Sequence, residues 1–170
     1  MELTEIDPAA GTPQRALISR RSEIALAIER LLSVAGRDVF GMQHDLAALE
    51  LSSTPTVAAL ERVLATRRGA RVRLLVDDTR WIDSQAARLR SLQRRFAHAL
   101  EIRMANPEDA VGEDSVLVVD QRHVLDLRIG RLVQGDLWLN HPLNARQWAE
   151  VFERRWAHAG HNLPVQPLGL

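Results

Sequence analysis

One segment of the chain, residues 113–128, constrains the fold more than any other. An uninterrupted apolar run at residues 116–119 ends at Asp120, and after Gln121 and Arg122 the chain returns with charged residues between apolar ones. Short β-branched runs on both sides of a polar turn are typical of a β-hairpin. The segment therefore predicts a hairpin whose first strand is buried on both faces and whose second strand is half-exposed.

Helices and strands alternate along the rest of the chain. Apolar residues at helical spacing predict the helices, and short apolar runs predict the strands. The predicted elements are a helix from Ser22, a strand at residues 38–42, a helix begun by Ser53, Thr54 and Pro55, a strand at residues 71–76, a helix capped by Asp83 or Ser84, a strand at residues 100–104, the hairpin, a short strand near residues 137–139, and a helix begun by a capping box of Asn144 and Gln147. This order indicates the α/β class, with helices packed on a sheet.

The length of 170 residues fits a single domain. Proline and glycine among polar residues predict a flexible lead-in at residues 1–18, followed by one α/β domain at residues 19–160 and an extended tail at residues 161–170. No apolar run approaches the roughly 18 residues needed to span a bilayer. The acidic N-terminus lacks the regions of a signal peptide. We therefore expect no membrane span and a cytoplasmic location.

Charge and residue usage exclude several classes of site. Twenty-two basic and 22 acidic residues leave no net charge, so nothing in the overall charge attracts nucleic acid or an anionic membrane. The sequence contains no Cys, and all 22 basic residues are Arg. These absences exclude disulfides, thiol nucleophiles, Cys-based metal sites and any catalytic lysine supplied by this chain.

The order of elements and two short motifs resemble one half of a phospholipase D-like domain. In that family an Arg-Gly-x-x-Val segment often leads into an apolar strand with acidic residues at its end, and residues 68–77 are similar. A late helix with spaced aromatic residues often closes the half, and Phe152 and Trp156 look like that pattern. The resemblance covers residues 24–158. It implies a half-domain with a mixed sheet flanked by helices, in a bacterial-type branch of the family.

The chain departs from the family at the catalytic signature, His-x-Lys-x4-Asp, which lies along a strand that ends at its Asp. If Asp120 matches that Asp, the His position falls on Glu113 and the Lys position on Ser115. The family's chemistry needs an imidazole as nucleophile on phosphorus and an ammonium group to stabilise the phosphate oxygens. A carboxylate repels a phosphodiester and a serine brings no charge. The resemblance therefore implies a domain that is inactive as a phospholipase D.

Other polar groups at predicted strand ends are the remaining candidates for catalysis. Asp77 and Asp78 follow a buried strand, where open α/β sheets place ligands, and Arg80 beside them is a candidate binding residue. Asp120 and His123 flank the hairpin turn. A hydrolase or phosphodiesterase with rearranged catalytic residues would use these groups, while the plainer interpretation is that the carboxylates cap turns or are solvated. The histidines do not assemble the three ligands of a zinc site, so neither a metal nor a cofactor is predicted.

Four arginines, Arg88, Arg90, Arg94 and Arg95, lie on one predicted helix with no acidic residue from 84 to 98. Guanidinium groups bind phosphate well, so this helix is a candidate surface for nucleic acid or a phospholipid headgroup. The alternative is a solvated face whose arginines pair with nearby acidic residues.

The preferred hypothesis is a non-enzymatic domain that binds a partner protein or a phosphate-bearing ligand. Active members of the resembled family need two halves facing each other, so a chain with one half also predicts a homodimer. Two alternatives stay open: the rearranged hydrolase, and a nucleic-acid-binding accessory domain that uses the arginine helix.

Overall fold

Strand β5 (Ser115–Val119) lies in the middle of the sheet, as the hairpin pattern predicts. The computed structural model describes residues 1–165, and within them seven strands form one sheet in the order β1-β7-β6-β5-β2-β3-β4. The parallel pairs are β2 with β3 and β3 with β4, and the other neighbours are antiparallel. The strands are β1 (Gln14–Ile18), β2 (Asp38–Met42), β3 (Arg71–Val76), β4 (Leu100–Met104), β5, β6 (His123–Ile129) and β7 (Val133–Leu139).

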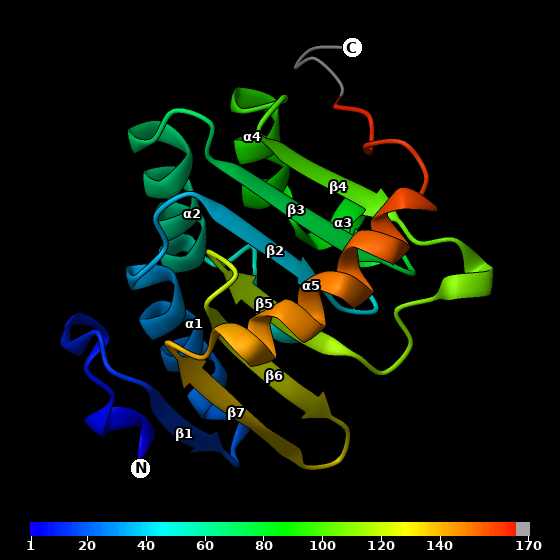
Figure 1. Cartoon of the computed structure of the whole chain (residues 1–170). Coiled ribbons are helices and arrows are strands. Elements are labelled where there is room, and N and C mark those ends of the chain that lie inside the picture. Colours follow the sequence, from blue (N-terminus) through cyan, green and yellow to red (C-terminus); the bar gives the residue numbers. More distant parts are fainter. Residues whose placement is uncertain (166–170) are drawn as a thin grey trace.

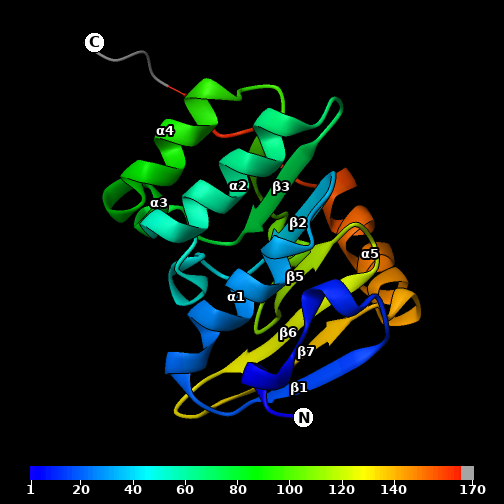
Figure 2. The same cartoon turned by 90° about the vertical axis from the view of Figure 1, so that its left-hand side faces the viewer.

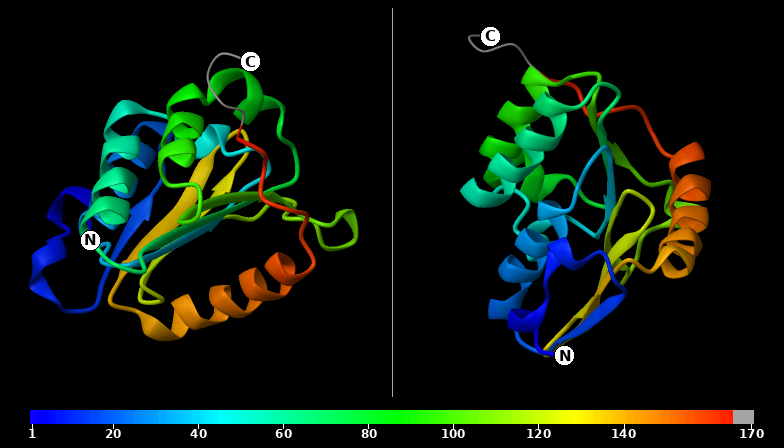
Figure 3. Two further views of the ribbon diagram at one scale, coloured as in Figure 1. Left: turned by 90° about the horizontal axis from the view of Figure 1, so that it is seen from above. Right: turned by 60° about the vertical axis from the view of Figure 1, so that its left-hand side comes forward.

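Helices cover both faces of the sheet. Four of the described helices lie on one face, and α5 crosses the other (Figures 1 and 2). The views in Figure 3 show the sheet between these two layers. The helices are α1 (Ile24–Ser33), α2 (Thr54–Thr66), α3 (Arg80–Gln85), α4 (Ala87–Arg95) and α5 (Pro142–Ala157). The α/β class and the mixed sheet flanked by helices are therefore confirmed. None of the helices in residues 1–165 has the length and apolar character that crossing a bilayer requires.

Each face of β5 belongs to a different core. Leu117 and Val119 pack into the core beneath α1, α2, α3 and α4, while Val116 and Val118 pack into the core beneath α5. Alternate side chains of a strand point to opposite faces, so a strand between two helix layers must be apolar throughout. The uninterrupted apolar run at residues 116–119 is the consequence.

The aromatic helix α5 is anchored on the sheet by stacking. The rings of Phe40 on β2 and Phe152 on α5 lie 4.4 Å apart, and Trp156 stacks on Phe152 at 5.4 Å. The buried guanidinium of Arg73 lies 4.9 Å from the Phe152 ring and forms two hydrogen bonds with Glu153 at 2.7 and 3.1 Å. This arrangement neutralises and partly covers a charge that would otherwise be costly to bury.

The predicted flexible lead-in needs correction, because residues 14–18 form the edge strand β1. This strand pairs antiparallel with β7 along its whole length. Leu3 and Ile6, farther toward the N-terminus, are buried in the core. The lead-in is therefore folded onto the domain.

The C-terminal segment lies along the outer edge of β4. Leu163 N donates to Ile102 O at 2.7 Å, and the Asn162 side chain accepts from Ile102 N at 2.9 Å. The extended tail predicted at residues 161–170 stays a prediction, since residues 166–170 lie outside the described part of the chain.

Two of the predicted helix starts differ from the observed ones. The Ser53 cap is confirmed, since its side chain accepts from Thr56 N. However, α5 begins at Pro142 without a side-chain cap, so the capping box of Asn144 and Gln147 is wrong. The single helix predicted after Asp83 is two helices, α3 and α4, because the chain bends at Ala86.

The close approach of β6 and β7 depends on Gly135. A Cβ at this position would lie 2.1 Å from Asp126 O and 2.9 Å from Leu127 Cα. We expect Gly135→Ala to lower the free energy of unfolding by about 3 kcal/mol, because backbone atoms cannot move away without separating the two strands. Urea denaturation measures the change. Gly130→Ala in the adjoining hairpin turn is the matched control, since a Cβ there meets nothing within 4 Å. Equal stability of the two variants would contradict the steric argument.

Candidate functional site

A cavity of about 780 Å³ opens at the edge of the sheet where β2 and β3 end and β5 begins. It exists because β6 runs past the start of β5. Ser115 pairs with Leu127, whereas Arg128 and Ile129 pair only with β7. The gap beyond Ser115 is bordered by the residues that follow β2, by the loop before β5, by the β6–β7 hairpin and by Trp148 of α5.

Asp77 holds the loop that leads into this cavity. Its carboxylate accepts from Val111 N at 2.8 Å and from Gly112 N at 2.9 Å, and it lies 3.6 Å from Nδ1 of His44. Two backbone hydrogen bonds fix the loop immediately before Glu113. Asp77 is therefore a positioning residue for one wall of the cavity.

Asp78 and Arg80 form a local ion pair. The guanidinium of Arg80 donates to both carboxylate oxygens of Asp78, and Arg80 N donates to the same carboxylate at 2.8 Å. These hydrogen bonds, the side-chain one above all, lower the pKa of Asp78 to about 2. A carboxylate with so low a pKa is a poor proton acceptor at neutral pH.

Asp120 lies at the opposite end of β5 from the cavity. Its side chain accepts from the backbone N–H groups of Gly36, Arg37 and Asp38 at 2.7, 2.9 and 2.9 Å. Asp120 and Gln121 both have positive φ, as the tightest hairpin turns require. Asp120 therefore ties the hairpin turn to the start of β2 and has a structural role.

His123 is also remote from the cavity. It pairs with Val119 at the start of β6, its side chain is buried, and its Nδ1 accepts from Asn140 N at 3.0 Å. Burial lowers the pKa of His123, so the imidazole is neutral at neutral pH.

The expected cluster of candidates at one strand end is corrected by the strand directions. Asp120 N donates to Asp38 O at the start of β2, whereas Asp77 N donates to His44 O just past its end. A strand rises about 3.3 Å per residue, so these two positions lie roughly 20 Å apart. Asp77, Asp78 and Arg80 therefore share one edge of the sheet, and Asp120 and His123 share the other.

The carboxylates around the cavity differ in how they are neutralised. Asp114 is bonded to Arg155 at 2.8 Å, while Glu113 and Asp126 have no ion pair among the described residues. Burial raises the pKa of the Asp126 carboxyl, and the nearby carboxylates of Asp136 and Asp114 raise it further, against the effect of Arg128. The cavity thus holds two carboxylates without a bonded cation.

Ser115 is the first residue of β5, and its side chain points to the face that α1 to α4 cover, together with Leu117 and Leu127. Its side chain is 2% exposed, and its Oγ has no hydrogen-bond partner among the described residues. Leaving a buried hydroxyl unsatisfied costs about 1–3 kcal/mol. Arg30 Nε, Asp38 Oδ2, Arg73 Nε and Arg155 Nε are likewise buried without a hydrogen-bond partner among the described residues, so this property does not single out Ser115.

Three cavity residues, His44, Asp126 and Trp148, were not predicted as site residues. His44 lies two residues after the end of the strand at residues 38–42. The expectation that ligands bind at the carboxyl ends of strands, which indicated Asp77, therefore applies to His44 as well. Asp126 alternates with apolar residues and resembles a solvated position. Trp148 belongs to the aromatic pattern of α5, which indicates only packing.

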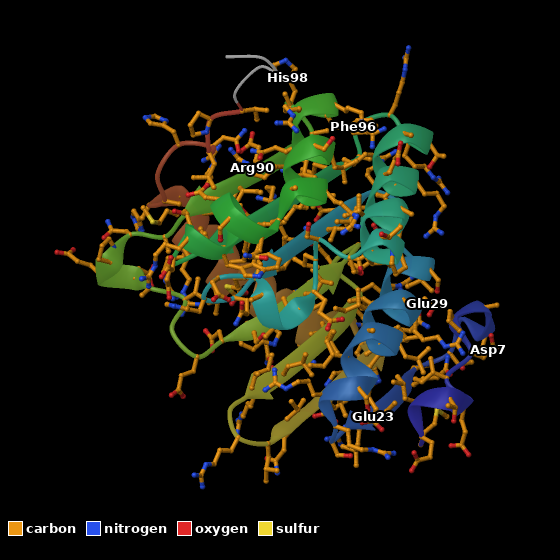
Figure 4. The ribbon with its side chains drawn as sticks, turned by 180° about the vertical axis from the view of Figure 1, so that it is seen from behind. Asp7, Glu23, Glu29, Arg90, Phe96 and His98 are labelled. Carbon is orange, nitrogen blue, oxygen red and sulfur yellow. The ribbon has the colours of Figure 1, made fainter. Side chains whose placement is uncertain are left out.

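The arginine helix is partly occupied by contacts within the domain. Figure 4 shows Arg90 on α4 and Phe96 directly after the last residue of this helix. Arg90 donates to Gln93 Oε1 and to Pro164 O, and burial lowers its pKa. Arg95 pairs with Glu61 at 2.6 Å. Of the four predicted binding arginines, only Arg88 and Arg94 have neither an ion pair nor a side-chain hydrogen bond within residues 1–165.

No group of three His, Asp or Glu side chains in residues 1–165 is placed to hold a metal ion.

Comparison with protein families matches residues 20–168 to a domain of unknown function, DUF7931. The chain belongs to this family. A comparison of this DUF7931 domain with curated proteins found no match.

Three solved structures share the fold of this DUF7931 domain at low identity. Nuc from Salmonella typhimurium, a phospholipase D family member, has a TM-score of 0.61 and 15% identity over 88% of this chain and 98% of its own. NucT from Helicobacter pylori has a TM-score of 0.59 and 11% identity over 88% and 99%. TrmBL2, an archaeal chromatin protein described as binding DNA, has a TM-score of 0.64 and 14% identity over 87% of this chain. This chain spans only 54% of TrmBL2. The domain therefore has the phospholipase D-like fold.

The Asp78–Arg80 pair gives a measurable pH dependence. Because the pKa of Asp78 is depressed from 3.8 to about 2, the ion pair persists in acid until the pH falls through about 2. Carbon-detected NMR titration of the Asp78 carboxyl should show this midpoint. Arg80→Ala should move the midpoint part of the way toward 3.8, since the backbone N–H of residue 80 still donates. Arg88→Ala should leave it unchanged, and a wild-type midpoint near 3.8 would show that the pair does not form.

Proposed function

We propose that this DUF7931 domain is a binding module with the phospholipase D-like fold and that it does not cleave phosphodiesters. The observation that carries the proposal is the place of Glu113 and Ser115. Both line the cavity at the entrance of β5, and both occupy the positions of the family's His and Lys when Asp120 is matched to the signature Asp.

The structure of the hairpin supports that match. In the family's signature the strand ends at its Asp, and here β5 ends immediately before Asp120. The structural role of Asp120 at the far end of the strand explains why the acidic residue is present although Glu113 and Ser115 replace the other two.

The cavity chemistry argues against phosphoryl transfer. Catalysis at phosphorus needs positive groups that stabilise the developing charge on the phosphate oxygens. The lining offers Arg128, which is exposed, against Glu113 and Asp126. The chain has no Lys to add. A site of this charge stabilises neither the ground state nor the transition state of a phosphodiester.

Self-association remains part of the proposal. This chain spans 98% of Nuc and 99% of NucT, so a single copy corresponds to one such domain. A homodimer would place two copies of the altered cavity in one particle. The cytoplasmic location and the bacterial-type branch stay predictions.

Hydrolysis of bis(p-nitrophenyl) phosphate tests the inactive site. We expect no release of p-nitrophenolate above the buffer rate, because the nucleophile and its phosphate-stabilising cation are both replaced. An active phosphodiesterase assayed in parallel shows that the conditions are adequate. Hydrolysis by the wild-type chain would refute the proposal. If His44→Asn then abolished that activity, the hydrolase with rearranged residues would be favoured, with His44 and Asp77 as its pair.

A second candidate is the nucleic-acid-binding accessory domain. It is favoured by Arg88 and Arg94 on α4, which have no ion pair or side-chain hydrogen bond within residues 1–165, and the similarly folded TrmBL2 is described as binding DNA. If α4 is the binding surface, the Arg88→Ala/Arg94→Ala double variant should elute from a DNA column at lower salt than the wild type. Arg131→Ala, which removes an exposed arginine from the β6–β7 turn, should change elution little. Equal elution of the double variant and the wild type would exclude α4 as the surface.

A further inference from the structure

A pocket of about 530 Å³ lies between α3, α4 and the C-terminal segment. Its lining shares no residue with the lining of the cavity beside β5. Arg90, labelled in Figure 4, donates to Pro164 O, and the side chain of Gln93 donates to Leu163 O at 3.2 Å. These hydrogen bonds between α4 and the C-terminal segment fix one wall of the pocket.

The guanidinium group of Arg90 is half-buried at this pocket and has no carboxylate partner among residues 1–165. Its hydrogen bonds go to two neutral oxygens, Gln93 Oε1 at 2.7 Å and Pro164 O. Burial lowers the pKa of Arg90; the carboxylate of Asp83 opposes this effect, and the positive charge of Arg94 adds to it. A partly buried charge is costly unless an opposite charge lies close to it. An anion in the pocket would therefore stabilise Arg90.

Arg94 brings a second positive charge to the same pocket. It lies four residues after Arg90 on α4, and residues at this spacing share one face of a helix. Its half-buried side chain forms neither an ion pair nor a hydrogen bond with residues 1–165. Against these two arginines the lining holds one carboxylate, that of Asp83, so one positive charge is left unbalanced. Two guanidinium groups on one face can donate to both oxygens of a carboxylate.

The other walls of the pocket suit the apolar part of a small organic molecule. They are formed by Ile82, Ala87, Leu163 and Pro164, and Thr79 adds a hydroxyl group that can donate a hydrogen bond. Pockets for small molecules typically have volumes of about 300–1,000 Å³ and combine apolar walls with a few polar groups. The volume of about 530 Å³ falls in that range. Size and lining together favour an organic anion over an inorganic one.

We propose that this pocket binds a small organic acid that has one carboxylate and an aliphatic chain. The two arginines bind the carboxylate, and the apolar walls cover the chain. The single unbalanced positive charge favours a monocarboxylate over a phosphate monoester, which carries up to two negative charges. The inference goes beyond the proposed function, because it concerns a separate pocket and does not depend on what the cavity beside β5 binds.

The test is NMR titration of the ¹⁵N-labelled full-length protein with hexanoate. We expect saturable shifts of the backbone amides at residues 79–87 and of the side-chain Nε–H groups of Arg90 and Arg94. Hexanamide has the same chain without the charge and should bind about tenfold more weakly, because it offers the arginines only a neutral acceptor. Inorganic phosphate has charge without the chain and should also bind more weakly than hexanoate.

Matched substitutions locate the site. Arg94→Gln should weaken hexanoate binding about tenfold, because a charged hydrogen-bond donor becomes a neutral one. Ala87→Trp should weaken it by a similar factor, since Ala87 is exposed and lines the pocket, so that the larger side chain occupies the space of the ligand. Arg88→Gln is the control, because it removes the same charge from the same helix at an exposed residue that does not line the pocket.

The outcomes separate this inference from the proposed function. Hexanoate binding that Arg94→Gln and Ala87→Trp weaken and Arg88→Gln does not supports the inference. It is overturned if millimolar hexanoate gives no saturable shift, if hexanamide binds equally well, or if inorganic phosphate binds more tightly. It is also overturned if either pocket variant binds like the wild type, or if Arg88→Gln weakens binding as much as Arg94→Gln. None of these results bears on hydrolysis of the phosphodiester substrate, so the two proposals can fail separately.

Discussion

The fold depends on a central strand with no face open to water. Both sides of β5 are packed by helices, so a polar side chain is tolerated only where the strand begins or ends. At its end Asp120 collects three backbone N–H groups and fixes the turn against β2. At its beginning Glu113 and Ser115 meet the cavity. The buried interior of the strand therefore confines its polar neighbours to the turn at one end and to the cavity at the other.

The sequence predicted the strands at residues 38–42, 71–76 and 100–104 but missed the strand at residues 14–18. All three have the predicted bounds, because polar or turn residues follow each of them, although residues 100–104 alternate apolar and charged side chains. Strand β1 alternates buried and exposed residues over only five positions. So short an alternation is a weak strand signal, and the nearby Pro8, Gly11 and Pro13 favour a loop instead. The strand becomes evident only from its pairing with β7.

The candidate site was only partly predictable because it depends on strand direction. Asp77 and Asp120 each follow an apolar run, and sequence gives them equivalent surroundings. Since β5 runs antiparallel to β2 and β3, the end of β5 meets the beginning of its neighbours. Glu113 was identified because the resemblance supplied a register, whereas no local signal distinguished Asp126 from a solvated carboxylate.

The C-terminal segment has a consequence for the solubility of the folded domain. An outer strand with unpaired N–H and C=O groups is a template on which other chains can add strands. Residues 162 and 163 already bond to β4; Gln93 of α4 donates to both of them, and Arg90 donates to Pro164 O, the next residue. Two side chains of the helix that the sequence indicates as a binding surface thus hold the segment that covers the β4 edge of the sheet. A chain that ended before Asn162 would leave the outer edge of β4 uncovered. Such a chain would be prone to edge-to-edge aggregation although its hydrophobic core remained intact.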